Sequence, residues 1–312
     1  RKSDILEYAD FCWQPPLNWI CLASYEKFLL ECGFYVANKK WSPFRLKISK
    51  GDSITKPDRN KYRPSQQTLA SSFTAINSFY TYLMNEEYCA GNPVLIAKRD
   101  CKYFIKDAQV KEIKRLTSSQ WQYVLDVAVE LADSDPHHER SLFLIAALKT
   151  FFLRISELSE RSGWSPIMSH FWEDDDGNWW LKIYGKGRKI RDVTVPVHFV
   201  EFLKRYRLSR GLSGLPSQGD TNPIIEKIRG RGGMTSRQLS RIVQTIFDYA
   251  YERMKNKEGE DKARKLKEAS AHWLRHTGAS LEIERGRSLK DLSEDLGHSS
   301  MATTDTVYVH SE

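Results

Sequence analysis

Two short motifs in the middle of the chain carry side chains that could bind an anion. The motif Leu-Arg-Ile-Ser-Glu-Leu places Arg154 three residues before Glu157, and a Gly-Lys-Gly turn carries Lys186. Arginine binds phosphate through paired N–H donors and lysine as a point charge. Each motif also has an ordinary explanation, because Arg154 could form a simple ion pair with Glu157 and a lysine in a hairpin turn is often only solvated. Neither motif identifies a site by itself.

A third motif, His-Trp-Leu-Arg, combines an imidazole with a guanidinium. Its spacing places His272 and Arg275 on the same face of a helix. Leu274, Gly278 and Leu281 form a different stripe of this helix, which would face the core. Because histidine can transfer a proton near neutral pH, the motif predicts a reactive face on a helix that is anchored by its other side. A helix-surface pair without function would have the same spacing.

A fourth motif, Leu-Gly-His, carries His298 and is followed ten residues later by Tyr308. A tyrosine hydroxyl can act as a nucleophile when a base removes its proton. The chain contains 14 tyrosines, so Tyr308 is uninformative alone. Only the combination of the four motifs can point to a function.

The charge of the chain favours an anionic partner. Its 312 residues include 48 Lys or Arg and 40 Asp or Glu, which gives a formal net charge of +8. The excess is concentrated in three clusters, at 39–63, 182–191 and 227–241, and aromatic residues are interleaved in the first. Such clusters are typical of polyanion binding, although any one of them could be a solvated loop.

Composition excludes several other classes of protein. The longest apolar run, Leu142–Leu148, is much shorter than a membrane span, and the first residues contain no apolar signal-peptide core. All five cysteines precede the first histidine, His137, so a Cys/His zinc finger is excluded there. No glycine-rich phosphate loop ends in Lys-Ser or Lys-Thr, and the acidic run 174–176 is more typical of a turn than of a two-metal site. We therefore expect a reduced intracellular protein without metal or cofactor.

Apolar periodicity predicts a mainly helical chain of two units. Residues 17–32 and 67–88 have helical spacing. Thr117 is a good N-cap for the first helix of a second unit, in which the nearly all-apolar helix 142–153 would be central. The clearest amphipathic helix spans 235–254. Three short strands are predicted at 167–172, 179–184 and 190–195, further helices at 271–285, 288–296 and 300–309, and an exposed loop or frayed helix at 255–267.

In order and approximate spacing, the motifs resemble those of the tyrosine recombinases, the phage integrase family. The matching positions are Arg154, Lys186, His272, Arg275, His298 and Tyr308, in the words Leu-Arg-Ile-Ser-Glu-Leu, Gly-Lys-Gly-Arg-Lys, His-Trp-Leu-Arg-His-Thr and Leu-Gly-His-Ser-Ser-Met-Ala-Thr-Thr. The helix beginning Thr-Ser-Arg-Gln-Leu-Ser at 235 resembles the one that precedes the His-x-x-Arg segment in the family. The resemblance is strong over 116–308 and weaker before.

The resemblance implies a site-specific recombinase that cleaves and rejoins DNA strands through a 3′-phosphotyrosyl intermediate. Tyr308 would be the nucleophile, and His272 would be the general base or proton relay that it needs, because a phenol of pKa about 10 is almost fully protonated at neutral pH. Arg154 and Arg275 would clamp the non-bridging phosphate oxygens. Lys186, or less plausibly Lys189, would protonate the leaving 5′-oxygen.

Two further residues receive roles by resemblance. His298 would donate a hydrogen bond to a phosphate oxygen, and Glu157 would orient the active-site groups from behind them. A covalent intermediate preserves the energy of the broken bond, which is consistent with the absence of a cofactor.

The resemblance also implies an architecture and partners. It predicts a C-shaped clamp formed by a helical core-binding domain at 1–107, a linker at 108–116 and a catalytic domain at 117–312, the last being mainly α with a small antiparallel three-stranded sheet. Four protomers would assemble on two double-stranded DNA sites in the cytoplasm of a prokaryote, at the nucleoid, with accessory DNA-bending or excision proteins. Backbone contacts are predicted for Lys39, Lys40, Arg45, Lys47, Lys50, Arg59, Lys61, Arg63, Arg188, Lys189, Arg231, Arg237 and Arg241.

Alternatives remain open within and outside this chemistry. Integration or excision of a mobile genetic element is the leading role, but chromosome-dimer or telomere resolution would use the same residues. A non-catalytic DNA-binding relative is a different class of protein, which the complete set of reactive residue types argues against. A type IB topoisomerase-like enzyme would share the residue set but relax DNA as a monomer.

Overall fold

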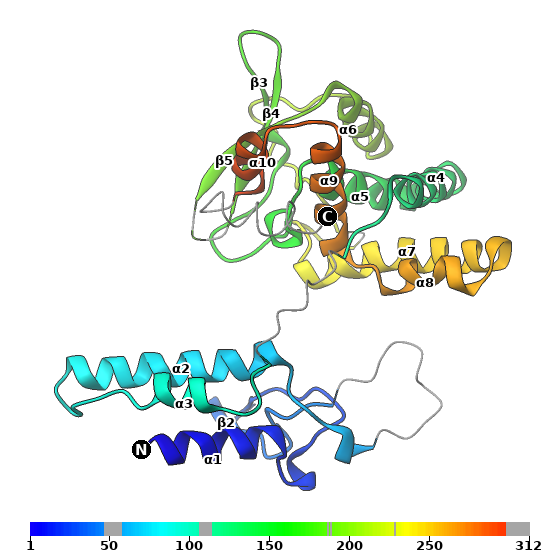
Figure 1. The fold of residues 1–312 in the computed structure, drawn as a ribbon. Coiled ribbons are helices and arrows are strands. Elements are labelled where there is room, and N and C mark those ends of the chain that lie inside the picture. Colours follow the sequence, from blue (N-terminus) through cyan, green and yellow to red (C-terminus); the bar gives the residue numbers. More distant parts are fainter. Residues whose placement is uncertain (47–57, 106–113, 186, 188, 228, 298–312) are drawn as a thin grey trace. The chain divides into compact units, whose positions relative to one another are not determined.

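The computed structural model describes residues 1–46, 58–105, 114–185, 187, 189–227 and 229–297 (Figure 1). The chain divides into two compact units, Arg1–Gln109 and Val110–Glu312, each with its own hydrophobic core. No described helix is long and apolar enough to cross a membrane.

The described residues of the first unit are built on three α-helices. They are α1 (Lys2–Trp13), α2 (Gln66–Asn85) and α3 (Val94–Asp100), with α3 in contact with both others. The Ser65 hydroxyl accepts the Thr68 N–H and so caps α2, which confirms the helix expected over 67–88. The core of this unit contains Leu69 and Phe73 from α2.

The helix expected over 17–32 is wrong. A single 3-10 turn forms at Leu17–Trp19, and β1 (Phe28–Glu31) pairs antiparallel with β2 (Phe34–Ala37). Cys32 and Gly33 join the two strands with φ values of 48° and 83°, the left-handed conformations that a two-residue hairpin turn requires. Glycine favours this turn, and the aromatic and branched residues beside it favour strands over helix.

The second unit surrounds a central helix, α5 (Glu139–Thr150). Every residue over 142–148 is buried, as the apolar sequence predicts. Among the described elements, α5 packs against α4 (Ser118–Ser134), α6 (Val197–Ser209), α7 (Ser236–Glu258) and α9 (Ala271–Glu284). Both α4 and α7 begin with a capping box, formed at Thr117 with Gln120 and at Thr235 with Gln238.

A small sheet completes this unit. It is antiparallel in the order β3 (Phe171–Glu173), β4 (Trp179–Tyr184), β5 (Ile190–Thr194), which confirms the predicted three-stranded sheet. The first strand begins later than expected, because a 3-10 turn occupies Met168–His170. The predicted fold class, mainly α with a small antiparallel sheet, is confirmed, while the C-shaped clamp stays a prediction.

The charged stretch 255–267 is a regular helical region, so the expectation of a loop or frayed helix is wrong. α7 continues to Glu258, and α8 (Glu260–Glu268) follows after Gly259. Ala263 and Leu266 are fully buried, and α8 packs along α7. Two well-placed apolar residues are therefore enough to anchor a helix whose remaining residues are mostly charged. The last described helix, α10 (Leu289–Leu296), follows α9; the helix expected at 300–309 lies outside the described residues.

Candidate active site

A sharp turn at the end of α5 projects Arg154 out of the core. Phe152 adopts a left-handed conformation with a φ of 52°, which is unusual for a residue with a bulky side chain. Its carbonyl oxygen accepts a hydrogen bond of 2.5 Å from Nη1 of Arg275 on α9. Arg154 follows as the N-cap of the 3-10 turn Ile155–Glu157. The turn thus brings one predicted arginine beside the other.

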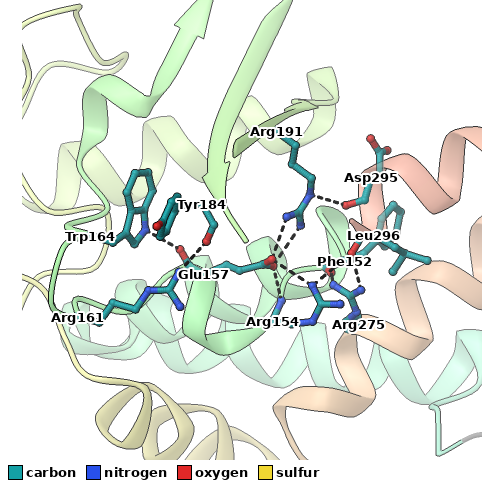
Figure 2. A network of polar contacts seen from close by, with 10 residues as sticks. All are labelled: Phe152, Arg154, Glu157, Arg161, Trp164, Tyr184, Arg191, Arg275, Asp295 and Leu296. Atoms are coloured by element: carbon teal, nitrogen blue, oxygen red, sulfur yellow. Dashed lines mark hydrogen bonds and ion pairs between the residues drawn. The ribbon is translucent and has the colours of Figure 1, made fainter. Parts of the chain in front are cut away.

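Arg154 and Arg275 converge on a single acceptor, the carbonyl oxygen of Leu296 at the end of α10. Nη2 of Arg275 donates to this oxygen at 2.7 Å and Nη1 of Arg154 at 3.5 Å (Figure 2). Arg275 is only 2% exposed, whereas the Arg154 side chain is 28% exposed. The convergence creates a local positive potential at which a phosphate group could be held.

His272 lies one helical turn before Arg275 and is exposed at the surface of α9. Partial desolvation lowers the pKa of His272, and the positive charges of Arg275 and Arg154 lower it further. Both effects favour the neutral imidazole, which is the form that can accept a proton. Its Nε2 atom lies 2.9 Å from Nε2 of His276, a neighbour that the sequence analysis did not single out. Their spacing of four residues could have predicted this contact.

Glu157 is 1% exposed and accepts hydrogen bonds from two arginines. The main-chain N–H of Arg154 donates to Oε2 at 2.8 Å, and Nη1 of Arg154 lies 3.4 Å from Oε1. The shorter side-chain contacts come from Arg191, whose Nη1 and Nη2 donate to Oε1 and Oε2 at 2.9 and 3.2 Å. Figure 2 shows the two arginines reaching the carboxylate from different elements. Glu157 thus contacts Arg154 from the buried side, while its role in orienting the active-site groups stays a prediction.

Arg191 on β5 was not predicted as a site residue. In the sequence it is one of five basic residues in 182–191, and nothing there separates it from solvated neighbours. Its Nε also donates to the carbonyl oxygen of Asp295 at 2.9 Å, so it joins β5 to the end of α10. Only the packing of β5 against the 3-10 turn of Glu157 and the end of α10 reveals this position.

Three of the six predicted catalytic residues, Lys186, His298 and Tyr308, lie outside the described residues. Their neighbours are placed. Gly185 N–H donates to the Lys189 carbonyl at 2.8 Å and closes the base of the hairpin that carries Lys186. Lys189 is exposed. Gly297, in the left-handed conformation, ends α10 immediately before His298.

The predicted DNA-backbone residues that the structure describes are all solvent-exposed, as a polyanion-binding side chain must be. They are Lys39, Lys40, Arg45, Arg59, Lys61, Arg63, Lys189, Arg231, Arg237 and Arg241. Lys47, Lys50 and Arg188 lie outside the described residues. Two aromatic residues of the first basic cluster, Phe44 and Tyr62, are buried in the core of the first unit and are not available to a partner.

No group of three or more His, Cys, Asp or Glu side chains that could hold a metal ion occurs within the described part of the chain. Asp174 lies in the turn between β3 and β4, where it accepts the main-chain N–H groups of Asp176 and Asn178, consistent with the predicted turn.

Comparison with known proteins defines the class. Residues 114–312, more than half of the chain, match the phage integrase family, and the chain therefore belongs to this family. Its members, the tyrosine recombinases, are DNA breaking and rejoining enzymes, and this chain is an enzyme of that type.

Two bacterial relatives extend the match beyond the family domain. The chain is 28% identical over 248 residues to the tyrosine recombinase XerD of Staphylococcus saprophyticus, covering 79% of this chain and 72% of the relative. It is 24% identical over 247 residues to the tyrosine recombinase XerC of Bacillus subtilis, covering 79% and 71%.

Solved structures share the fold. The XerH site-specific recombinase, bound to its palindromic difH substrate in a post-cleavage complex, superposes with a TM-score of 0.58 at 20% identity, and the match covers 80% of this chain and 65% of that one. The Tn1549 transposon integrase, in complex with a circular intermediate DNA, gives a TM-score of 0.52 at 17% identity, over 78% of this chain and 76% of that one. At these identities the likeness establishes the fold alone.

Proposed function

We propose that the chain is a site-specific DNA recombinase that cleaves and rejoins strands through a 3′-phosphotyrosyl intermediate, with Tyr308 as nucleophile. The observation that carries the proposal is the convergence of Arg154 and Arg275 on the Leu296 carbonyl oxygen. Arg275 lies one helical turn after His272 on α9. Two guanidiniums that converge on one acceptor, with an imidazole one turn before Arg275 on the same helix, are groups that transfer of a phosphoryl group to a weak nucleophile requires. The scissile phosphate of the DNA would bind at this point.

In the proposed step, the phenolic oxygen of Tyr308 attacks the scissile phosphorus while the bond from phosphorus to the 5′-oxygen breaks. His272 accepts the phenolic proton, directly or through a relay, and its lowered pKa keeps it ready to do so. Arg154 and Arg275 hold the non-bridging oxygens, to which His298 adds a hydrogen bond. Lys186 donates a proton to the departing 5′-oxygen, with Lys189 as the alternative donor. Rejoining is the reverse reaction and needs no other reactant.

The architecture and biological role are proposed on the same basis. Residues 1–107 act as the core-binding domain and 117–312 as the catalytic domain, joined by a linker at 108–116, and the exposed basic residues of both units contact the DNA backbone. Four protomers assemble on two DNA sites, with accessory DNA-bending or excision proteins. The reaction serves the integration or excision of a mobile genetic element, the leading role that the phage integrase family match favours.

A suicide substrate tests the chemistry. A labelled duplex from the native element, nicked near the cleavage point, traps the covalent intermediate because the short strand downstream is lost. We expect the wild-type protein to form a covalent adduct without added metal and Tyr308→Phe to form none. Tyr249→Phe is the matched control, because Tyr249 is an exposed tyrosine on α7 of the same unit.

An adduct that persists in Tyr308→Phe would disprove the assignment of the nucleophile. A wild-type protein that binds the duplex tightly but yields no adduct, even when synapsis is promoted by high protein concentration, would favour the non-catalytic DNA-binding alternative. Relaxation of supercoiled DNA by single protomers would favour the topoisomerase-like one.

A further inference from the structure

We propose that Arg191 is a positioning residue of the active site, which aligns the phosphate-binding arginines by holding Glu157 and the end of α10 together. This inference rests on the proposed function. Arg191 acts through its neighbours and does not itself touch the DNA, since the side chain is only 14% exposed and its donors are directed at protein atoms.

The guanidinium of Arg191 makes three hydrogen bonds to two separate segments. Two run to the Glu157 carboxylate, at 2.9 and 3.2 Å, and the third runs from Nε to the Asp295 carbonyl oxygen at 2.9 Å. Glu157 fixes Arg154 through its main-chain N–H. The residue after Asp295 is Leu296, whose carbonyl oxygen is the common acceptor of the two phosphate-binding arginines. One side chain therefore holds both Arg154 and the common acceptor of the two arginines, the pair that we call the arginine clamp (Figure 2).

Two glycines make room for this guanidinium. A Cβ atom at Gly185 would lie 2.9 Å from Nη1 of Arg191 and 3.3 Å from Oε1 of Glu157, and one at Gly297 would lie 3.1 Å from the same Nη1. A larger residue at either place would displace the side chain. The close fit on two sides indicates that the surroundings define the position of the guanidinium as well as its charge.

The geometry requires arginine. A lysine at 191 would neutralise Glu157 but could not reach both carboxylate oxygens and the Asp295 carbonyl at once, because an ammonium lacks the planar fork of donors. If Arg191 served only to balance charge, Arg191→Lys would leave the cleavage rate unchanged. If Arg191 aligns the arginines, Arg191→Lys slows cleavage. A misplacement of about 1 Å in a catalytic group can cost about 100-fold in rate.

The test compares Arg191→Lys with wild type in three measurements: duplex affinity, thermal midpoint and the single-turnover rate of adduct formation on the nicked duplex. Arg205→Lys is the matched control. Arg205 forms a similar two-bonded pair with Glu139, with Nε donating to both carboxylate oxygens at 2.8 and 2.9 Å, but that pair lies at the opposite end of α5 from Arg154. We expect Arg191→Lys to bind DNA within about twofold of wild type and to cleave about 100-fold more slowly, and Arg205→Lys to cleave at the wild-type rate.

A second substrate distinguishes slow cleavage caused by a misplaced arginine clamp from slow cleavage caused by a misplaced general acid, Lys186. Sulfur in place of the bridging 5′-oxygen leaves without needing a proton, so it restores the rate when only the general acid is misplaced. We expect the Arg191→Lys defect to persist with this substrate, because the clamp is what has moved. Restoration of the rate by sulfur would overturn the proposal, as would an Arg191→Lys protein that cleaves normally.

Gly185→Ala gives an independent version of the test should Arg191→Lys fail to fold. It keeps every charge and places a Cβ atom 2.9 Å from Nη1 of Arg191, which displaces the guanidinium, so the same pattern of normal binding and slow cleavage of both substrates is expected. Normal cleavage by Gly185→Ala would count against the proposal. If wild type and Arg205→Lys form no adduct, the proposed function fails first and the role of Arg191 falls with it.

Discussion

Gly278 on α9 lies so close to Lys149 on α5 that a Cβ atom at position 278 would stand 2.0 Å from the Lys149 carbonyl oxygen. The same Cβ atom would stand 2.8 Å from the ring of Phe152. A hydrogen atom at this position therefore lets α9 approach α5, and the approach brings Arg275 to the turn that carries Arg154. The packing of two helices sets the distance between the two arginine side chains that we propose bind the phosphate.

Gly278→Ala should lower the free energy of unfolding by about 2 kcal/mol, because steric overlap with backbone outweighs the better helix propensity of alanine. Urea denaturation followed by circular dichroism measures the change. Gly214→Ala is the control, since its Cβ would meet only Lys204 Cγ at 3.8 Å. A variant as stable as wild type would mean that α9 can shift without cost, and the spacing of the arginines would then not depend on this close approach.

Thr277→Val should destabilise the second unit by about 1–3 kcal/mol. The fully buried Thr277 hydroxyl accepts the Leu116 N–H at 2.9 Å and donates to the Trp273 carbonyl at 2.7 Å, so an isosteric valine leaves a buried N–H without an acceptor. Thr245→Val serves as the control in the same denaturation experiment. Thr245 makes the equivalent bond to the carbonyl four residues earlier but is exposed on α7, and its loss should change little.

His272 should titrate below the ordinary histidine pKa of 6.5 in the free protein. Because folding favours the neutral imidazole, its contribution to stability is complete above that ordinary value and is lost as the pH falls toward the lowered one. NMR of ¹³C-labelled histidine measures the midpoint. Arg154→Gln removes one of the charges that lower the pKa, so the midpoint should rise in that variant; no change would show that Arg154 does not act on the imidazole.

Neutralising Lys39 and Lys40 together should weaken duplex binding to all sequences alike. Both side chains are exposed, and removing a lysine that neutralises a phosphate should reduce the slope of log affinity against log salt by about 0.9. Fluorescence anisotropy with specific and random duplexes, at several salt concentrations, measures both effects. Lys262→Gln on α8, whose Nζ lies 3.3 Å from Glu258, is the control. Weaker binding of the specific duplex alone would mean that these lysines read sequence.

Local patterns in the sequence predicted most of the elements of the second unit. The capping residues Thr117 and Thr235 begin helices where expected, and β4 spans the predicted residues 179–184. These features depend on hydrogen bonds and side chains only a few residues apart, so the sequence contains the information directly. The order of the reactive residue types was likewise sufficient to indicate the family.

Tertiary structure decided the features that depend on distant contacts. Whether 255–267 would be helical depended on a surface of α7 able to bury Leu266, and the strands near Cys32 depended on the turn that pairs them. Most clearly, the partners of Arg191 lie 34 residues before it at Glu157 and 104 residues after it at Asp295. The spacing of residues along a helix or strand specifies which side chains share a face, but only packing of the elements determines which charged groups meet.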